Sequence, residues 1–393
     1  MVISELRIEE KENHTYLITD IDSKFSKKNK FWYRVEKKYG SWLTSDVYDA
    51  FLVASIWPCM CYNEDIHIKG SVSKKLYKNI VQYVVPLIKT LRPHYSNISI
   101  TVDGFKDCQQ NEPFVVGTGF SGGVDSFSTI YDKYENEDDK DYRINTLFFF
   151  HIGQYGKYGE PETEKHAKDH YLLSKKFADE IKLPFVYMDS NMFEFYKPHW
   201  EYDAGPLCRI ASILVFQKVC FRYYVSGSYD YTQLCEFEKF KHLDDVSDPF
   251  IYLMLSTNAC DIILDGSQLR RSKKTDNISN YEFTKRHLNV CVNKNVDFER
   301  EKNCSICHKC NRTLIILEGL GKLNEFENIF NIPKYKKQAF KFKCLAKLGY
   351  NKNPFDKDII DFLKSRNLKV PPRLTAYAYI LASRIKNKIA RYL

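Results

Sequence analysis

Residues 114–134 place glycine, hydroxyl and carboxylate residues between two apolar segments. A strand-like run over Phe114–Gly119 leads into Ser121-Gly-Gly-Val-Asp-Ser126, and a helix is predicted over Ser126–Tyr134. Gly122 and Gly123 lack a Cβ atom, so an anion can approach their amides closely. The start of the helix adds unpaired N–H groups and a positive dipole end, and the two serines add hydroxyl donors. The segment therefore predicts a phosphate-binding loop.

The loop lacks the Gly-Lys-Ser/Thr of a Walker A motif, and the carboxylate of Asp125 takes the place of the lysine. A carboxylate beside a phosphate site is suited to hold Mg²⁺. We therefore expect Asp125 to hold Mg²⁺ on bound phosphates, with Asp125 and Ser121 in catalytic roles. The competing interpretation is a tight turn with incidental serines. The residues predicted to bind the nucleotide here are Ser121, Gly122, Gly123, Val124, Asp125 and Ser126.

Four of the twelve cysteines lie close together, as Cys291, Cys304, Cys307 and Cys310. Four soft ligands with two-residue gaps suit tetrahedral Zn²⁺ and would fill its coordination sphere, so we expect a structural zinc site. An iron–sulfur cluster on the same four cysteines is the alternative. Haem attachment at Cys304-Ser-Ile-Cys307-His308 is disfavoured because that chemistry requires export. The other eight cysteines are expected to be reduced and mostly buried.

Ser226-Gly-Ser-Tyr-Asp-Tyr231 follows a predicted strand. Gly227 and Ser228 are candidates to line the nucleotide pocket, because ligands of parallel sheets bind at the carboxyl ends of strands. An ordinary strand-to-loop turn is the alternative.

The charged segment 265–274 precedes the cysteines. Its candidates for stabilising phosphate charge are Arg270, Arg271 and Lys273, with Arg270 and Lys273 assigned catalytic roles. A solvated basic face explains the segment equally well.

Ser121-Gly-Gly-Val-Asp-Ser126 after a buried strand resembles the PP-loop of the N-type ATP pyrophosphatases. That superfamily includes asparagine and GMP synthetases, tRNA thiolation enzymes and 7-cyano-7-deazaguanine synthase. The resemblance implies a Rossmann-like fold of the adenine nucleotide alpha hydrolase type, ATP with Mg²⁺, and release of pyrophosphate. It also implies an adenylylated carboxylate or carbonyl, from which a nitrogen or sulfur nucleophile displaces AMP.

A PP-loop followed by one cysteine and then Cys-x-x-Cys-x-x-Cys is most similar to the 7-cyano-7-deazaguanine synthase family. This similarity covers residues 114–320 and implies a ligase that uses ammonia and ATP to convert a deazaguanine carboxylate to a nitrile, with a zinc site of this kind. The gap between Cys291 and Cys304 is longer than the family pattern, and the chain has extra regions at both ends. The substrate therefore stays open, as a deazapurine or another carboxylate.

The elements that must position these residues alternate between strand and helix from residue 113 onward. Continuous apolar strands alternating with helices predict an α/β fold with a parallel sheet covered on both faces. The strands are expected at Phe114–Gly119, Thr146–Ile152, Phe185–Met188 and Tyr223–Ser226, and the helices at Ser126–Tyr134, Glu162–Ile181 and Gly205–Phe221.

Three regions are predicted: a mixed α/β domain over 1–110, the PP-loop domain with the four-cysteine zinc site over 111–320, and a basic helical region over 321–393. The first region carries a helical pattern over Ser73–Leu91, in which Pro86 predicts a kink or break. Its other expected elements are strands at Tyr16–Thr19, Phe31–Val35, Ile66–Ile68 and Ile98–Val102 and a helix at Ser45–Trp57.

The net charge of +9 is concentrated near the C-terminus. Between Lys334 and Leu393 there are 16 Lys and Arg residues against three Asp, a net charge of +13, which leaves −4 for the rest. Lysines interleaved with Tyr and Phe could contact RNA phosphates and bases. The alternative is a packed amphipathic helix with a solvated basic side, because Leu374, Tyr377, Ile380, Leu381 and Ile385 form an apolar stripe.

The chain shows neither a signal peptide nor an 18-residue apolar stretch, so we expect a cytoplasmic enzyme without a membrane partner. The preferred hypothesis is an adenylylating ligase acting on a small molecule. The alternatives are a tRNA-modifying enzyme that binds RNA with its basic C-terminal region, and a nucleotide-binding scaffold without catalytic activity. A homo-oligomer is expected only from the resemblance.

Overall fold

The computed structural model describes residues 1–156, 159–196, 201–236, 247–293, 296 and 301–389. The chain forms two compact units, and each is described by itself. Unit 1 comprises Met1–Ser121, Asp132–Gly227 and Leu234–Asp265, and unit 2 comprises Gly122–Tyr131, Ser228–Gln233 and Gly266–Leu393.

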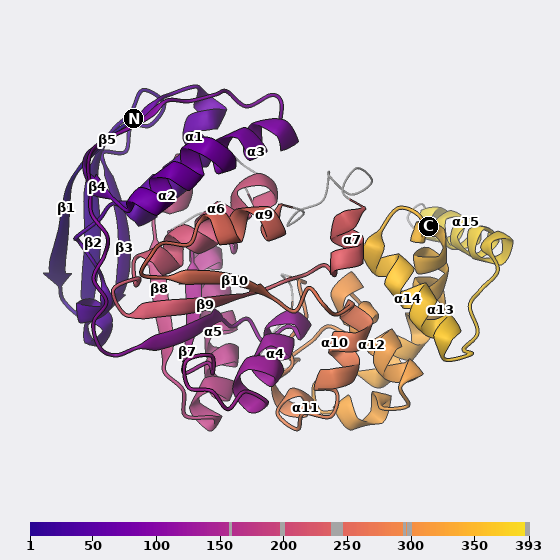
Figure 1. The fold of residues 1–393 in the computed structure, drawn as a ribbon. Helices are drawn as coiled ribbons and strands as arrows, with labels where there is room; N and C mark the ends of the chain where they lie inside the picture. Colours follow the sequence, from indigo (N-terminus) through magenta and orange to yellow (C-terminus); the bar gives the residue numbers. More distant parts are fainter. Residues whose placement is uncertain (157–158, 197–200, 237–246, 294–295, 297–300, 390–393) are drawn as a thin grey trace. The chain divides into compact units, whose positions relative to one another are not determined.

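Unit 1 is built on one ten-stranded sheet (Figure 1). The strands lie in the order β10-β9-β6-β7-β8-β3-β2-β1-β4-β5. Their bounds are β1 Val2–Lys11, β2 His14–Asp22, β3 Lys30–Glu36, β4 Ile66–Val72, β5 Ile100–Phe105, β6 Val115–Gly119, β7 Thr146–His151, β8 Phe185–Ser190, β9 Cys220–Ser226 and β10 Asp261–Asp265.

The five neighbouring strands from β10 to β8 pair in parallel. The strand–helix alternation predicted a parallel sheet with β6, β7, β8 and β9, whereas β10 was not predicted. All six residues of β7 are buried, which matches an apolar strand covered on both faces. The chain passes from β6 to β7 and β8 on one side, and then returns to β9 and β10 on the other. Such a reversal of strand order is where α/β sheets commonly bind ligands, at the carboxyl ends of the strands.

Residues 1–110 do not form a sheet of their own. Antiparallel pairing of β3 with β8 joins β1–β5 to the parallel strands, so the sheet is mixed but mostly parallel. The predicted strands of this region are present, whereas β1, which pairs with β2 and β4, was not predicted. The division into three domains at residues 110 and 320 stays a prediction.

The helices of unit 1 pack on this sheet. Helix α1 places Phe51 and Ile56 in the core, and both are fully buried. The predicted break at Pro86 is not present, because the chain stays helical from Lys74 to Leu91. Pro86 lies in the first turn of α3, after a π-helical turn over Ile80–Val84 that follows α2. The larger α-helices are α1 Asp49–Tyr62, α2 Lys74–Asn79, α3 Val85–Leu91, α5 Pro161–Glu180, α6 Glu201–Leu214 and α9 Asp248–Met254.

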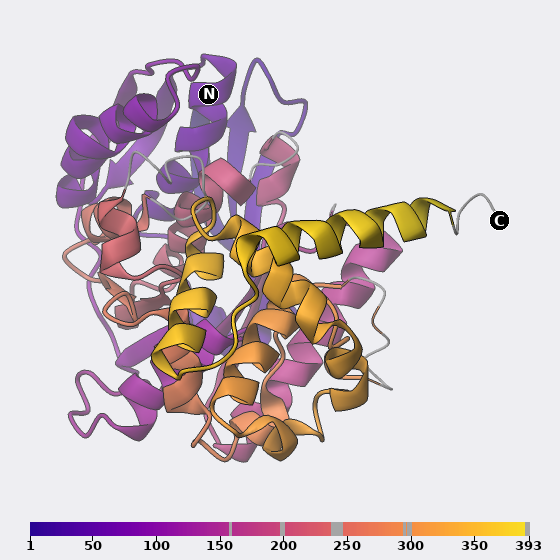
Figure 2. The same cartoon turned by 90° about the vertical axis from the view of Figure 1, so that its right-hand side faces the viewer.

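The described residues of unit 2 form helices joined by loops and contain no strand, and the chain after Asn311 is mainly helical, as predicted. The apolar faces of α12, α13 and α14 form a core around Ile316, Ala346 and Ile360. Helix α15 packs on α13 through Ala376 and Ile380 and extends beyond the other helices of the unit (Figure 2). The helices are α4 Val124–Ile130, α10 Arg271–Ile278, α11 Thr284–His287, α12 His308–Gly319, α13 Ile332–Gly349, α14 Pro354–Ser365 and α15 Arg373–Ile389; α7 Tyr231–Cys235 spans the boundary with unit 1.

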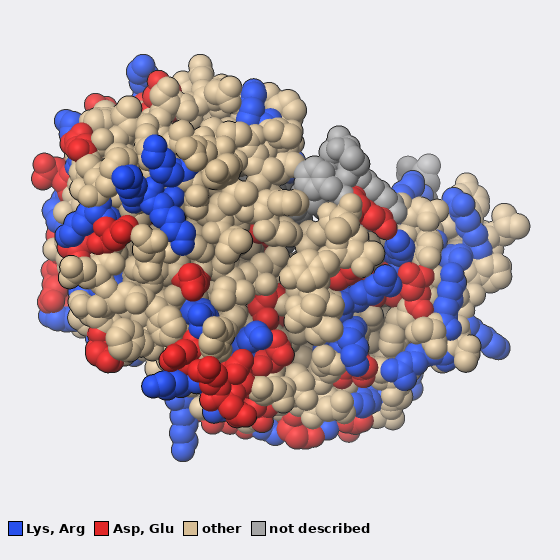
Figure 3. Space-filling view, viewed as in Figure 1, with Lys and Arg blue, Asp and Glu red and all other residues tan. Residues whose placement is uncertain are grey.

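Among the described residues, no helix has the length and apolar character needed to cross a membrane. Lys and Arg side chains gather over the helices of unit 2 (Figure 3, right). On α15, Leu374 and Tyr377 are 85% and 62% exposed whereas Ile380 is buried, so only part of the predicted apolar stripe packs inside unit 2.

Candidate functional site

The predicted phosphate loop opens unit 2 at the point where the chain leaves β6. Gly122 has a φ of +72°, a left-handed conformation that side-chain-bearing residues rarely adopt, and Gly123 is extended with a φ of −81°. Helix α4 then begins at Val124, whose side chain is fully buried. This burial leaves Asp125, in the first turn, on the partly exposed side of the helix.

Asp125 contacts two cations carried by α10. The Oδ2 atom of Asp125 accepts from the Arg271 guanidinium at 2.5 Å, and Nζ of Lys274 lies 3.5 Å from Oδ1. Arg271 and Lys274 are three residues apart on α10, so they project from one face of the helix. Burial by itself raises the pKa of Asp125, but the charges of Arg271 and Lys274 outweigh it and lower that pKa. The carboxylate is therefore ionised at neutral pH.

Helix α14 of the C-terminal region positions α10. Ser272, in the first turn of α10, donates its backbone N–H to Asp358 at 2.8 Å and its hydroxyl at 2.6 Å. A carboxylate at a helix N-terminus satisfies free N–H groups and the dipole. Arg270, just before α10, lies 3.7 Å from Asp361. The C-terminal helices thus support the helix that carries Arg271 and Lys274.

An aromatic contact from α14 also supports the arginines. Phe355 stacks on Tyr229 with ring centroids 5.1 Å apart, and the guanidinium carbon of Arg312 lies 4.4 Å from the Phe355 ring. Arg271 lies 5.8 Å from the same ring. Burial lowers the pKa of Arg312, and its Nε has no hydrogen-bond partner. A planar ring beside two guanidinium groups restricts their rotamers without removing their charge.

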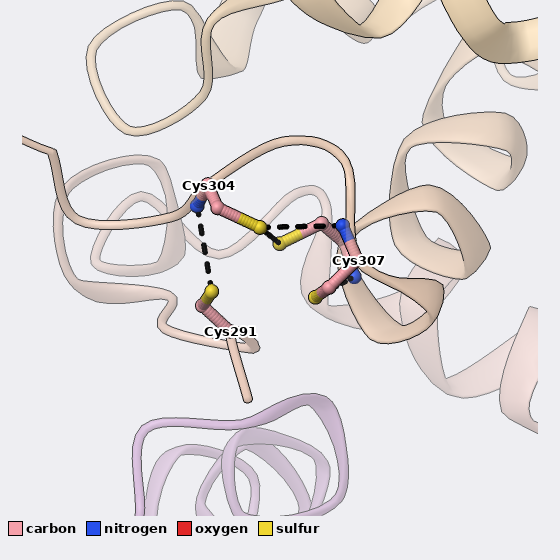
Figure 4. Close-up of side chains that lie close together, drawn as sticks. Cys291, Cys304 and Cys307 are labelled. Atoms are coloured by element: carbon pink, nitrogen blue, oxygen red, sulfur yellow. Dashed lines mark hydrogen bonds between the residues drawn. The ribbon is translucent and has the colours of Figure 1, made fainter. Parts of the chain in front are cut away.

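The four predicted cysteine ligands meet in unit 2. The Sγ atoms of Cys291, Cys304, Cys307 and Cys310 all lie within 4.8 Å of one another. Cys304 donates its backbone N–H to the sulfur of Cys291 at 3.4 Å, and Cys307 donates to that of Cys304 at 3.2 Å (Figure 4). Amide donors aimed at sulfur stabilise thiolates. This cluster could bind a metal ion such as zinc, and its donor set fits a closed tetrahedral site.

Helix α12 begins at this cluster, with Cys307 as its N-cap. Its first two turns carry Lys309 and Arg312, although cations are disfavoured at the positive end of a helix. The carboxylate of Asp125 compensates part of this charge, since Lys309 contributes to the lowered pKa of Asp125. Unit 2 thus concentrates positive charge beside Gly122 and Asp125, which suits a multiply charged anion.

A short segment connects the cysteine cluster to the glycine loop. Asn289, two residues before Cys291, donates its backbone N–H to the carbonyl oxygen of Gly122 at 2.8 Å. A Cβ at Gly122 would stand 3.7 Å from Cβ of Asn289. The side-chain Nδ2 of Asn289 is buried and has no partner.

The structure brings some of the predicted site residues together and not others. Ser126 donates its hydroxyl to Gly123 inside the loop, at 3.1 Å. Arg270 contacts Asp361 and, at 3.9 Å, Asp230. Lys273 is 56% exposed and pairs with Asp276. Neither Arg270 nor Lys273 contacts Asp125 among the described residues, and Arg271 and Lys274 take that place.

Ser121 and Gly227 belong to unit 1. Ser121 is exposed, and Gly227 donates its backbone N–H to Asp265 at 2.8 Å, where β9 and β10 end. Ser228 belongs to unit 2, as does Val124, which serves to anchor α4.

Several residues of the site were not predicted. Lys274 is separated from Arg271 by one helical turn, and the buried positions Thr275 and Ile278 mark the same side of α10, so the period of the helix could have indicated it. Asn289 and Phe355 had no local signal, because their roles depend on contacts with residues far away in the sequence.

The chain matches no family model, no curated protein and no solved structure at the significance applied.

Proposed function

We propose that the protein is an ATP-dependent ligase of the PP-loop type, with a Rossmann-like ATP-binding domain, that cleaves ATP to AMP and pyrophosphate to activate a carboxylate. The observation that carries the proposal is Asp125, held between Arg271 and Lys274 at the start of the helix that follows the glycine loop. Glycine amides, two cations and one carboxylate are the groups that bind polyphosphate with Mg²⁺.

The residues fit ATP in two further respects. Gly122 has a left-handed backbone conformation that favours glycine, and the neighbouring Gly123 is only partly buried, so an anion can approach the loop there. The side-chain Nδ2 of Asn289, a neighbour of Gly122, is buried and has no hydrogen-bond acceptor. A buried donor without an acceptor costs about 1–3 kcal/mol of folding free energy. A Mg²⁺ ion would be held by Asp125, which implies that Asp125 is released from Arg271 when the phosphates bind.

In the proposed reaction, a carboxylate oxygen of the substrate attacks the α-phosphorus and pyrophosphate leaves. The resulting acyl adenylate has AMP as leaving group, which an amine or ammonia displaces. Arg271 and Lys274 stabilise charge that develops on the phosphates. The substrate proposed is a 7-deazapurine carboxylate or a related small carboxylate, and zinc at the four cysteines is proposed to be structural.

The test is to incubate the full chain with ATP, Mg²⁺, ammonia and 7-carboxy-7-deazaguanine, and to measure AMP and pyrophosphate. We expect their formation to depend on the carboxylate and to be lost in Asp125→Asn. Turnover that survives unchanged in a folded Asp125→Asn variant would show that the loop is not the reactive site.

Slow AMP release that does not depend on the deazapurine would support the ATP chemistry and indicate that the substrate is another carboxylate. RNA as the substrate predicts AMP release that depends on tRNA and weakens with salt.

A further inference from the structure

The glycine loop and the cysteine cluster are linked by four residues, Leu288–Cys291, which we call the strap. At one end, the backbone N–H of Asn289 holds the carbonyl oxygen of Gly122 at 2.8 Å. At the other end, the strap reaches Cys291, the first cysteine of the cluster. Gly122 has a φ of +72° and, as a glycine, has a wide choice of backbone conformations, so a hydrogen bond to its carbonyl oxygen can help to select one of them.

Asn303 fixes the strap from its other side. Its Oδ1 accepts from the backbone N–H of Val290 at 2.8 Å, and its Nδ2 donates to the carbonyl oxygen of Leu288 at 2.9 Å. Asn303 is 1% exposed and directly precedes Cys304. Cys304 in turn donates its N–H to the sulfur of Cys291 at 3.4 Å. The segments before Cys291 and before Cys304 are therefore held together where both reach the cluster.

A metal ion would lock this arrangement. Four thiolates within 4.8 Å of one another repel each other unless a cation lies between them, and metal binding displaces their protons. With the metal bound, Cys291 and Cys304 stay adjacent, the strap stays closed, and Asn289 holds Gly122. Without it, the contact of Cys291 with Cys304 depends on hydrogen bonds such as the 3.4 Å bond from the Cys304 N–H to the Cys291 sulfur, and we expect the strap to be held less firmly.

We propose that metal occupancy of the cysteine cluster sets the affinity of the glycine loop for nucleotide, with Asn303 as the positioning residue that transmits it through the strap. This inference rests on the proposed nucleotide site and adds its regulation. Because binding free energies are reciprocal, nucleotide must also raise the affinity of the cluster for metal by the same factor.

The first experiment measures zinc affinity of the full chain by equilibrium competition with a chromophoric chelator, with and without saturating ATP and Mg²⁺. We expect ATP to tighten zinc binding about fivefold or more, within the usual range of coupling between sites. The same titration with Lys274→Met, in which the loop has lost a cation, corrects for zinc held by ATP itself. Equal zinc affinity with and without ATP would overturn the proposal.

The second experiment measures ATP binding by calorimetry for Asn303→Ala and for the exposed control Asn280→Ala. Asn303→Ala keeps all four cysteines, and we expect it to retain zinc while binding ATP about fivefold or more weakly, a loss typical of coupled sites. The control is expected to match the wild type. A folded, zinc-loaded Asn303→Ala protein with wild-type affinity for ATP would contradict the proposal.

The two proposals fail in different ways. If zinc-loaded wild type binds no ATP, the proposed function fails. If wild type binds ATP but its affinity is the same with zinc loaded and with zinc removed, only the link through Asn303 fails. Should removal of zinc unfold the protein, the comparison of zinc-loaded Asn303→Ala with zinc-loaded wild type decides.

Discussion

The Arg271 guanidinium lies 2.5 Å from the carboxylate of Asp125, although 146 residues separate them in the sequence. Asp125 belongs to the first turn after the glycine loop, and Arg271 to the first turn of α10. Two segments that follow parallel strands thus bring opposite charges to one point of unit 2. This pair is the basis of the proposed phosphate site.

The zinc site can be tested with paired cysteine variants. Cys307→Ser removes one of four ligands, whereas Cys235→Ser changes an exposed cysteine outside the cluster. We expect about one zinc per chain in wild type and Cys235→Ser, and a strong loss in Cys307→Ser with a lower thermal midpoint, because metal binding stabilises the fold. Metal analysis with calorimetry checks this. Equal zinc and equal midpoints in both variants would refute a four-cysteine site.

The support of α10 by α14 predicts unequal effects of two aspartates. Asp358→Ala removes a buried acceptor of two hydrogen bonds from Ser272 and should cost about 1–3 kcal/mol of unfolding free energy. Asp361→Ala removes a 3.7 Å contact with the 43% exposed Arg270 and a 2.9 Å hydrogen bond from the Tyr350 hydroxyl. Because Asp361 is itself 29% exposed, the loss should be about 0–1 kcal/mol. Urea denaturation of both variants measures the difference, and equal losses would contradict this role of Asp358.

Asp189, the penultimate residue of β8 in unit 1, is expected to make the free energy of unfolding depend on pH. Burial raises its pKa to about 6, even though Arg34 contacts it at 2.5 Å and opposes the shift. The raised pKa means that the folded state binds this proton more tightly than the unfolded state, so this group lowers stability as the pH rises from about 4 to 6.

Arg34→Met leaves Asp189 charged without its partner at pH 8, where we expect a loss of about 3–5 kcal/mol. At pH 5 the folded protein holds Asp189 mostly protonated, and the loss should be smaller. Urea midpoints of the variant and of wild type at both pH values test the sign. A larger loss at pH 5 would show that the carboxyl is not held in its protonated form.

Much of the α/β core could be predicted from the sequence because its signals are local. β6, β7, β8 and β9 are short apolar runs bounded by turns, and their positions were predicted within a few residues. β1 was missed because Ser4, Glu5 and Arg7 interrupt its apolar residues, and Glu5 has a φ of 56° where the register shifts. The antiparallel pairing of β3 with β8 joins segments about 150 residues apart in the sequence, so no local pattern indicates it.

The sequence predicted those parts of the candidate site that are defined by residue types at a characteristic spacing. The glycine loop and the four cysteines were located by motif, and the cysteine sulfurs do meet. The choice among four cations in 270–274 depends on the orientation of α10, which is set by Ser272 and Asp358. Sequence spacing alone could not supply that orientation.

The most direct test of the account is the dissociation constant for ATP with Mg²⁺ in Lys274→Met and Lys273→Met, measured on zinc-loaded full chain. The two lysines are adjacent, and each variant loses one positive charge, but only Lys274 faces Asp125 while Lys273 pairs with Asp276. Loss of a charged contact to phosphate is worth about 1.5–3 kcal/mol, so we predict that Lys274→Met binds ATP at least about tenfold more weakly. Lys273→Met should stay near wild type. Equal affinity in the two folded variants, or no binding of ATP by wild type, would contradict a nucleotide phosphate site at Asp125.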